Sequence, residues 1–144
     1  MNKIPLQYDY FISTRWRNRD LALDLTNKLR KKNKKVYCFF ENKFAQKHAS
    51  ENPEEFMKKF EATKNWKKDK YVNGIFKDDL DALKKAKSLI MLLPSGKSSH
   101  IEAGIAYGLN KKCILIGEQT ETESLYLIFS EFYPDLNSFL KNLN

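Results

Sequence analysis

The stretch SLIMLLPSGKSSHIEAGIAYGLNKKCILIG, residues 88–117, decides the fold of this chain. Two almost wholly apolar runs, at 88–94 and 113–117, flank a loop of small residues and a segment with helical spacing at 100–109. Such apolar runs are typical of central strands in a parallel sheet, because these strands are buried on both faces. Strand, helix and strand in this order predict a right-handed βαβ unit whose two strands are central and adjacent.

The N-terminal part of the chain repeats this alternation. YDYFIS at 8–13 and VYCFF at 36–40 predict two strands, and the apolar residues between Asp20 and Leu29 recur at helical spacing. Together these elements form a βαβ-type opening, which favours a parallel sheet.

Residues 41–87 hold two further predicted helices. Pro53 precedes EEFMKKFEA and fits the first turn of a helix. FKDDLDALKKAK, at 76–87, has an amphipathic pattern. Trp66 and Tyr71 lie in the connection between the helices, either as covers for the sheet edge or as part of a lid over a site. The buried stripe of the second helix is predicted to be Phe76, Leu80, Leu83 and Ala86.

The whole order of elements predicts the fold class. A short helix is predicted from about 134 to 143, and the apolar segment before it fits either a helix or a strand. We therefore expect an α/β fold over residues 1–144: a single-domain doubly wound, flavodoxin-like parallel sheet of about five strands with helices on both faces. Ligands of such sheets bind beyond the carboxyl ends of the strands. TRWRN (14–18) and PSGKSS (94–99) both follow strands directly, so we expect them side by side at one crevice.

Composition restricts the function classes. The net charge is +8, from 26 Lys+Arg against 18 Asp+Glu, but the lysines scatter without an aromatic-studded basic patch, so nucleic acid is not an expected partner. No apolar run approaches the ~20 residues of a membrane span, and we see no signal-peptide pattern, so we expect no membrane partner and a cytoplasmic protein. Cys38 and Cys113 are expected to be reduced core thiols, and the two histidines are far apart. We expect no metal and no cofactor.

Glu102 is the residue of the opening stretch whose role needs an explanation. One interpretation is structural: Ser99 and Glu102 fit the S-x-x-E capping box, which satisfies free amides at a helix start. The other is chemical: the glutamate lies beside the predicted crevice, where the helix dipole and free amides would keep its carboxylate ionised. An ionised carboxylate in a crevice is what nucleophilic attack on a sugar carbon requires.

The residues from Asp79 to Lys112, with the core E-x-G-x-A at 102–106, resemble the nucleoside 2-deoxyribosyltransferase-like superfamily, which includes deoxynucleoside 5′-monophosphate N-glycosidases. The resemblance covers mainly residues 74–117, and YDYFISTRWRN near the N-terminus adds support. It implies an enzyme that cleaves the N-glycosidic bond of a (deoxy)nucleoside or its 5′-monophosphate, as a hydrolase or a transferase. It also implies a homo-oligomer.

The resemblance further implies roles for three residues. Glu102 would attack C1′, expel the base and form a glycosyl-enzyme ester, which water or another base resolves. Asp79 would assist protonation of the leaving base, with its neighbour Asp78 as the alternative. Tyr10, on the first strand, would supply an aromatic hydroxyl that orients the nucleophile.

The sequence departs from the family near the predicted crevice. The first loop reads STRWRN where the family usually carries glycine, and Lys97 stands where transferases have an aspartate for the sugar hydroxyl. A lysine beside hydroxyls and amides at a helix N-terminus fits a phosphate instead. The two arginines of the first loop fit either a second anionic contact or an exposed surface. The candidate substrate-binding residues are Ser13, Arg15, Arg17, Gly96, Lys97, Ser98 and Ser99.

Two other functions stay open at this point. One is a TIR-like enzyme that cleaves NAD, since those domains share the layered fold and a glutamate nucleophile. The other is a non-catalytic module that binds a nucleotide and signals by its shape. Release of free base from a nucleoside, a nucleotide or NAD would separate these functions.

Overall fold

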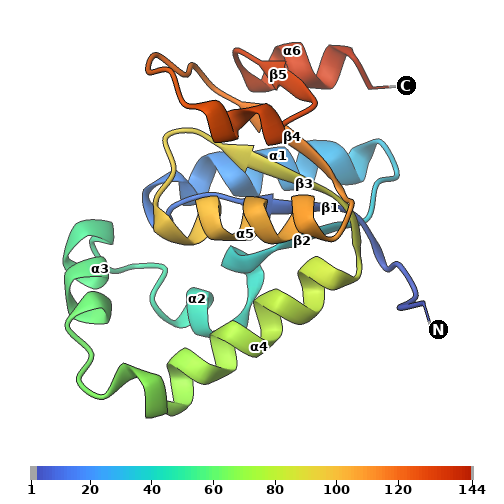
Figure 1. Cartoon of the computed structure of the whole chain (residues 1–144). Helices are drawn as coiled ribbons and strands as arrows, with labels where there is room; N and C mark the ends of the chain where they lie inside the picture. Colours follow the sequence, from blue (N-terminus) through green and yellow to red (C-terminus); the bar gives the residue numbers. More distant parts are fainter. Residues whose placement is uncertain (1–2, 144) are drawn as a thin grey trace.

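The structure is a computed structural model and describes residues 3–143. Five parallel strands form one sheet in the order β2-β1-β3-β4-β5 (Figure 1). This is the strand order of flavodoxin-like doubly wound sheets, so the predicted fold class is confirmed. The strands are β1 (Tyr8–Ser13), β2 (Val36–Cys38), β3 (Ala86–Leu92), β4 (Lys112–Ile116) and β5 (Glu131–Tyr133).

The two strands of the opening stretch are central and adjacent, as predicted. β3 pairs with β1 on one side and with β4 on the other, and β4 also pairs with β5. The side chains of β3 from Leu89 to Leu92 are 0% exposed. Burial on both faces is the reason that this strand is apolar at every one of these positions.

Helices cover both faces of the sheet. On one face, Leu25 of α1 and Phe139 of α6 belong to an apolar core with alternate strand residues. On the other, Leu83 of α4 and Ala103 of α5 belong to a second core (Figure 1). Among residues 3–143 no helix is long and apolar enough to cross a membrane. The α-helices are α1 (Arg19–Lys31), α2 (Lys43–Lys47), α3 (Pro53–Glu61), α4 (Lys70–Lys84), α5 (Lys97–Gly108) and α6 (Leu136–Lys141).

The structure corrects the predicted boundaries and buried stripe of α4. This helix begins at Lys70, because the Asp69 side chain caps it by accepting hydrogen bonds from two backbone amides. Only its C-terminal part lies against the sheet, so Phe76 is 60% exposed, whereas Leu83 is buried as predicted. Ala86 belongs to β3 and not to the helix.

The remaining segments settle two open points. The unassigned apolar segment of the tail is a 3₁₀ helix, Ser124–Ile128, followed by β5. Trp66 and Tyr71 are both mostly exposed, so neither covers the sheet edge. Cys38 and Cys113 are buried and free, as predicted, and burial raises the pKa of the Cys113 thiol to about 11.

Candidate active site

The carboxylate of Glu102 does not cap its own helix. α5 starts at Lys97 after Gly96, which has no side chain to cap it, so Glu102 lies in the second turn. Ser99 is buried within the first turn instead of preceding the helix. The capping-box interpretation is therefore wrong, because the small-residue loop lets the helix begin earlier than the 100–109 pattern predicts.

Glu102 is instead tied to the first strand. The Ser13 hydroxyl, at the carboxyl end of β1, donates a hydrogen bond of 2.7 Å to Glu102 Oε1. Burial, together with the negative charge of Asp79, raises the pKa of Glu102 to about 8, although the Ser13 hydrogen bond acts in the opposite direction. The sequence predicted that the helix N-terminus would keep this carboxylate ionised, but the loss of hydration is the stronger effect here.

Asp79, on α4, is the second carboxylate of the site. The Tyr37 hydroxyl donates a hydrogen bond of 2.9 Å to Asp79 Oδ1, and the Asn42 amide donates one of 2.8 Å to the Tyr37 oxygen. Burial raises the pKa of Asp79 to about 6, while the Tyr37 hydrogen bond lowers it. Its neighbour Asp78 is exposed, so the structure brings Asp79, and not Asp78, to Glu102.

The structure does not bring Tyr10 to Glu102. Tyr10 faces the α1 and α6 side of the sheet, where its ring meets Phe139 edge-on with centroids 6.0 Å apart. Tyr37 of β2 supplies the aromatic hydroxyl of the site, and sequence reasoning missed it. A signal was present: Val36 and Cys38 are the buried residues of VYC, so strand alternation puts the tyrosine on the opposite face.

The loops after β1 and β3 meet at the carboxyl edge of the sheet, as predicted. The Thr14 hydroxyl donates to the Leu92 carbonyl at 2.9 Å, and the Asn18 amide donates to the Pro94 carbonyl at 2.7 Å. These contacts hold the loop that leads into α5, and Ser13 precedes Thr14 directly. The hydroxyl donor and the helix that carries Glu102 are thus positioned by the same loop pair.

The candidate phosphate-binding residues differ in their exposure and in their contacts. Lys97 and Ser98 are exposed, and the first turn of α5 has no side-chain cap, so its amides can face an anion. Arg17 extends to Glu54 of α3 in an exposed ion pair of 2.9 Å. Arg15 is half-buried, and its Nε has no hydrogen-bond partner among the described residues.

Comparison with known proteins adds one finding. No family model matches the sequence, and no curated protein matches it. A solved structure, the CMP N-glycosidase BcmB of Clostridium botulinum, matches with a TM-score of 0.55 and 19% identity over 92% of this chain and 95% of that chain. This chain shares the fold of a CMP N-glycosidase. At this identity the likeness concerns the fold alone, so the roles of Glu102 and Asp79 rest on their geometry.

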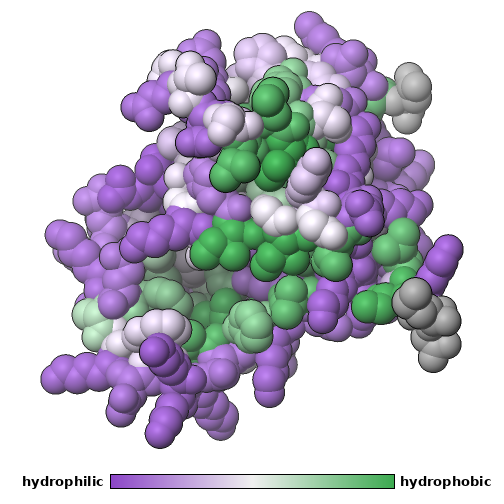
Figure 2. All heavy atoms as spheres, in the orientation of Figure 1, coloured by the Kyte–Doolittle hydropathy of each residue, from purple (hydrophilic) through white to green (hydrophobic). Residues whose placement is uncertain are grey.

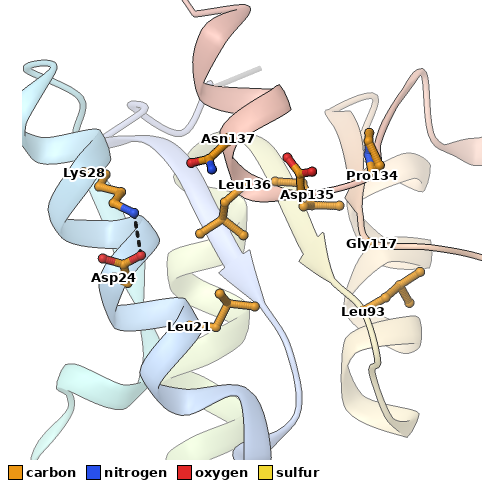
Figure 3. Close-up of a pocket in the computed structure, with 10 residues that line it drawn as sticks. Leu21, Asp24, Lys28, Leu93, Gly117, Pro134, Asp135, Leu136 and Asn137 are labelled. Atoms are coloured by element: carbon orange, nitrogen blue, oxygen red, sulfur yellow. Dashed lines mark hydrogen bonds and ion pairs between the residues drawn. The ribbon is translucent and has the colours of Figure 1, made fainter.

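The molecule has an apolar hollow below α5, and cavities lie elsewhere on it. In Figure 2 the molecule is hollowed below α5, and apolar residues line the hollow. A separate cavity of about 430 Å³ lies at the start of α5, where His100 Nε2 and the Tyr126 hydroxyl are 2.8 Å apart. Another, of about 360 Å³, lies between α1 and α6 on the opposite face (Figure 3). Neither cavity is lined by Glu102 or Asp79.

Within residues 3–143, no group of three or more His, Cys, Asp or Glu side chains is arranged to hold a metal. The fold does bring together two carboxylates, each with a hydroxyl donor, from distant parts of the chain. Two partly buried carboxyl groups with raised pKa values suit nucleophilic and acid–base catalysis.

Proposed function

We propose that this chain, as one nucleoside 2-deoxyribosyltransferase-like domain over residues 1–144, cleaves the N-glycosidic bond of a nucleoside or nucleoside 5′-monophosphate with Glu102 as the nucleophile. The observation that carries the proposal is the pair of partly buried carboxylates, Glu102 and Asp79, which lie on two different helices. Each accepts a hydrogen bond from a hydroxyl of a neighbouring strand. The fold shared with a CMP N-glycosidase supports the same class of substrate.

The reaction proceeds in two steps. The Glu102 carboxylate attacks C1′, the C1′–N bond breaks with its electron pair going to the base, and Asp79 gives its proton to the base. Water then attacks the glycosyl ester, Asp79 takes a proton from it, and Glu102 leaves as a carboxylate. The sum is nucleotide plus water to free base plus sugar phosphate. If a second base replaces water, the same first step leads to transfer.

The raised pKa values set the protonation state of the pair. Since the pKa of Glu102 is about 8 and that of Asp79 about 6, the pair holds one proton between these pH values. By these values the proton lies mainly on Glu102, and catalysis uses the minor form in which it lies on Asp79 while Glu102 is ionised. The lower limb of the pH profile then follows mainly Asp79, and the upper limb mainly Glu102. We therefore expect kcat/KM to follow a bell-shaped profile with limbs near these two pH values.

The start of α5 is proposed to bind the 5′-phosphate. Lys97 supplies a charge that is exposed to solvent, Ser98 supplies a hydroxyl, and the uncapped amides after Gly96 favour an anion. Arg15 is proposed as a further contact, since its Nε lacks a partner among the described residues. Arg17 would have to leave Glu54 to take part.

We also propose that the protein assembles as a homo-oligomer. Large apolar side chains are exposed on α5 and on the 124–128 segment, among them Ile101 at 63%, Leu125 at 73% and Leu127 at 82%. Figure 2 shows green apolar surface over these regions. Exposed apolar patches of this kind mark contact surfaces between proteins.

The proposed function is tested by a screen for free base. Purified protein is incubated with nucleosides, their 5′-monophosphates and NAD, and base release is measured by chromatography. Release from a nucleoside or nucleotide is expected, and Glu102→Gln should reduce it by several orders of magnitude, because an amide cannot form the ester. Release from NAD alone would favour the TIR-like alternative. No release from any substrate, or full activity of Glu102→Gln, would overturn the proposal.

A further inference from the structure

We propose that Tyr37 and Asn42 are positioning residues that direct the acid proton of Asp79 to its Oδ2 atom, toward the leaving base. This inference rests on the proposed function, because it assigns the proton donor of that reaction at the level of single atoms. It starts from a hydrogen-bond chain, Asn42 to Tyr37 to Asp79, that neither the sequence resemblance nor the shared fold assigns.

The direction of the chain follows from its donors. Asn42 Nδ2 donates to the Tyr37 oxygen at 2.8 Å, and an amide nitrogen can only donate. The phenol oxygen therefore accepts in that contact, and its own hydrogen is available to Asp79 Oδ1, 2.9 Å away. Oδ1 is occupied as an acceptor, so the proton of the acid form of Asp79 belongs on Oδ2.

The packing around Tyr37 holds this geometry. Its ring stacks on Phe11 of β1 with centroids 5.0 Å apart, and Tyr8 meets it edge-on at 5.6 Å. Asn42 is fixed at the start of α2, where its backbone amide donates to the Phe39 carbonyl. A carboxyl group held by such a rigid donor keeps its second oxygen at one place, which is what proton transfer to a bound base requires.

Among the described residues, the titratable groups that lie next to Asp79 come from three elements. They are Tyr37 from β2, Glu102 from α5, and the neighbouring Asp78 on α4, whose charge raises the pKa of Tyr37 and Asp79. Glu102 has its own donor, Ser13 from β1. Because each carboxylate has a separate hydroxyl donor, removing one donor should change the pKa of one carboxylate more than that of the other.

The test compares Tyr37→Phe with Ser13→Ala in the pH dependence of kcat/KM. Loss of the Tyr37 hydroxyl removes a donor to ionised Asp79, so the acid limb should move up by about one pH unit. Loss of the Ser13 hydroxyl should instead move the basic limb up. In Tyr37→Phe, kcat should also fall on the order of 10- to 100-fold with KM little changed, since Oδ2 is no longer held in place. Asn42→Ala should give a smaller shift of the acid limb in the same direction.

Two controls separate positioning from folding and from the proposed function. Tyr8→Phe removes a hydroxyl from the same aromatic cluster and should leave both limbs unchanged. In the substrate-free protein, carbon-13 NMR of labelled aspartate should show the Asp79 carboxyl, assigned with Asp79→Asn, ionising at higher pH in Tyr37→Phe. If the wild type cleaves nucleotides but both the acid limb and the Asp79 pKa are unchanged in Tyr37→Phe, the inference is overturned. A shifted Asp79 pKa in a protein that cleaves no substrate would overturn the proposed function and support the placement of Tyr37.

Discussion

At the scale of single residues, the site depends on two carboxyl groups that lose part of their hydration when the chain folds. Glu102 and Asp79 both have raised pKa values because burial disfavours their charged forms; the charge of Asp79 also raises the pKa of Glu102, and the charge of Asp78 that of Asp79. Such an arrangement costs folding free energy when both groups are ionised. Natural proteins retain costs of this kind where reactivity needs them.

The first prediction concerns stability and pH. The pKa of Glu102 is raised from 4.5 to about 8 in the folded protein, so the folded state binds more protons than the unfolded chain between these values. The stability present at low pH is therefore lost as the pH rises from about 4.5 to 8. Glu102→Gln removes this loss and should be more stable than the wild type at pH 8, by on the order of a few kcal/mol. Urea unfolding of both proteins at pH 5 and pH 8 measures this difference. If the free energies of unfolding of the variant and the wild type differ by the same amount at both pH values, the prediction is wrong.

The second prediction distinguishes the two neighbouring aspartates. Asp79→Asn should lower base release by ~10²–10⁴-fold, the usual size for loss of proton transfer. Asp78→Asn is the matched control, because Asp78 is exposed and its side chain makes no hydrogen bond among the described residues. Steady-state kinetics of both variants check this, and comparable losses in the two would argue against Asp79 as the acid.

At the scale of elements, the geometry of the site is set where β3 and β4 end. Leu93 N donates to the Ile116 carbonyl, and Gly117 N donates to the Tyr133 carbonyl, so the strand ends are held together just before the loop into α5. Gly117 has φ = 123°, and a Cβ added there would lie 2.7 Å from Leu93 Cβ. Glycine is needed at this strand end for both reasons.

The third prediction follows from that strand end. Gly117→Ala should lower the free energy of unfolding by roughly 1–3 kcal/mol, through the strained backbone and the clash with Leu93. Gly74→Ala in α4 is the control, since nothing lies within 4 Å of the added Cβ. That variant should gain about 0.5–1 kcal/mol from helix propensity. Thermal and urea unfolding measure both changes, and a neutral Gly117→Ala would refute the close contact.

The fourth prediction concerns the start of α5. Lys97→Ala should weaken binding of a nucleoside 5′-monophosphate by roughly 1.5–3 kcal/mol, because a charge-assisted contact to phosphate is lost. Affinity for the matching nucleoside should change little. Calorimetry with a matched nucleoside and nucleotide measures the difference, using Glu102→Gln as the background to prevent turnover. Equal losses for both ligands would argue against a phosphate site.

At the scale of the whole molecule, both faces of the sheet carry helices, yet apolar surface remains outside them. The α1 and α6 side and the α4 and α5 side each enclose a core. The exposed Leu125 and Leu127 belong to the 3₁₀ segment that connects β4 to β5. This surface is available to a second copy of the chain.

The fifth prediction tests that assembly. The wild type should run as an oligomer in size-exclusion chromatography with light scattering, and Leu127→Lys should shift it toward the monomer, because a charge cannot be buried unpaired in an apolar contact. Leu21→Lys, on α1 at the opposite side of the sheet, is the control and should leave the mass unchanged. A monomeric wild type would exclude the proposed homo-oligomer.

The sequence alone predicted four of the five strands, the doubly wound fold class and the position of Glu102 after β3. It left β5 undecided and extended β2 to residue 40, where the structure has a 3₁₀ helix, Phe39–Glu41. The correct predictions follow from local patterns: buried strands must be apolar, helices must repeat apolar residues every three to four positions, and loops after parallel strands share one edge. The meeting of the two loops could be predicted for the same reason, whereas Asp79, with Asp78 as the alternative, was implied by the resemblance to the family. The predicted start of α5 was wrong because the same sequence fits two helix starts. One is a helix capped by Ser99 and Glu102, and the other, which the structure has, begins directly after Gly96.

Only the tertiary structure decided which side chains touch. Ser13 and Glu102 are 89 residues apart in the chain, and Tyr37 and Asp79 are 42 apart. Their contacts depend on strand register and on which face of the sheet each residue occupies, so Tyr37 rather than Tyr10 reaches the Asp79 carboxylate. The raised pKa values have the same origin, because hydration is lost only when the helices close over the sheet.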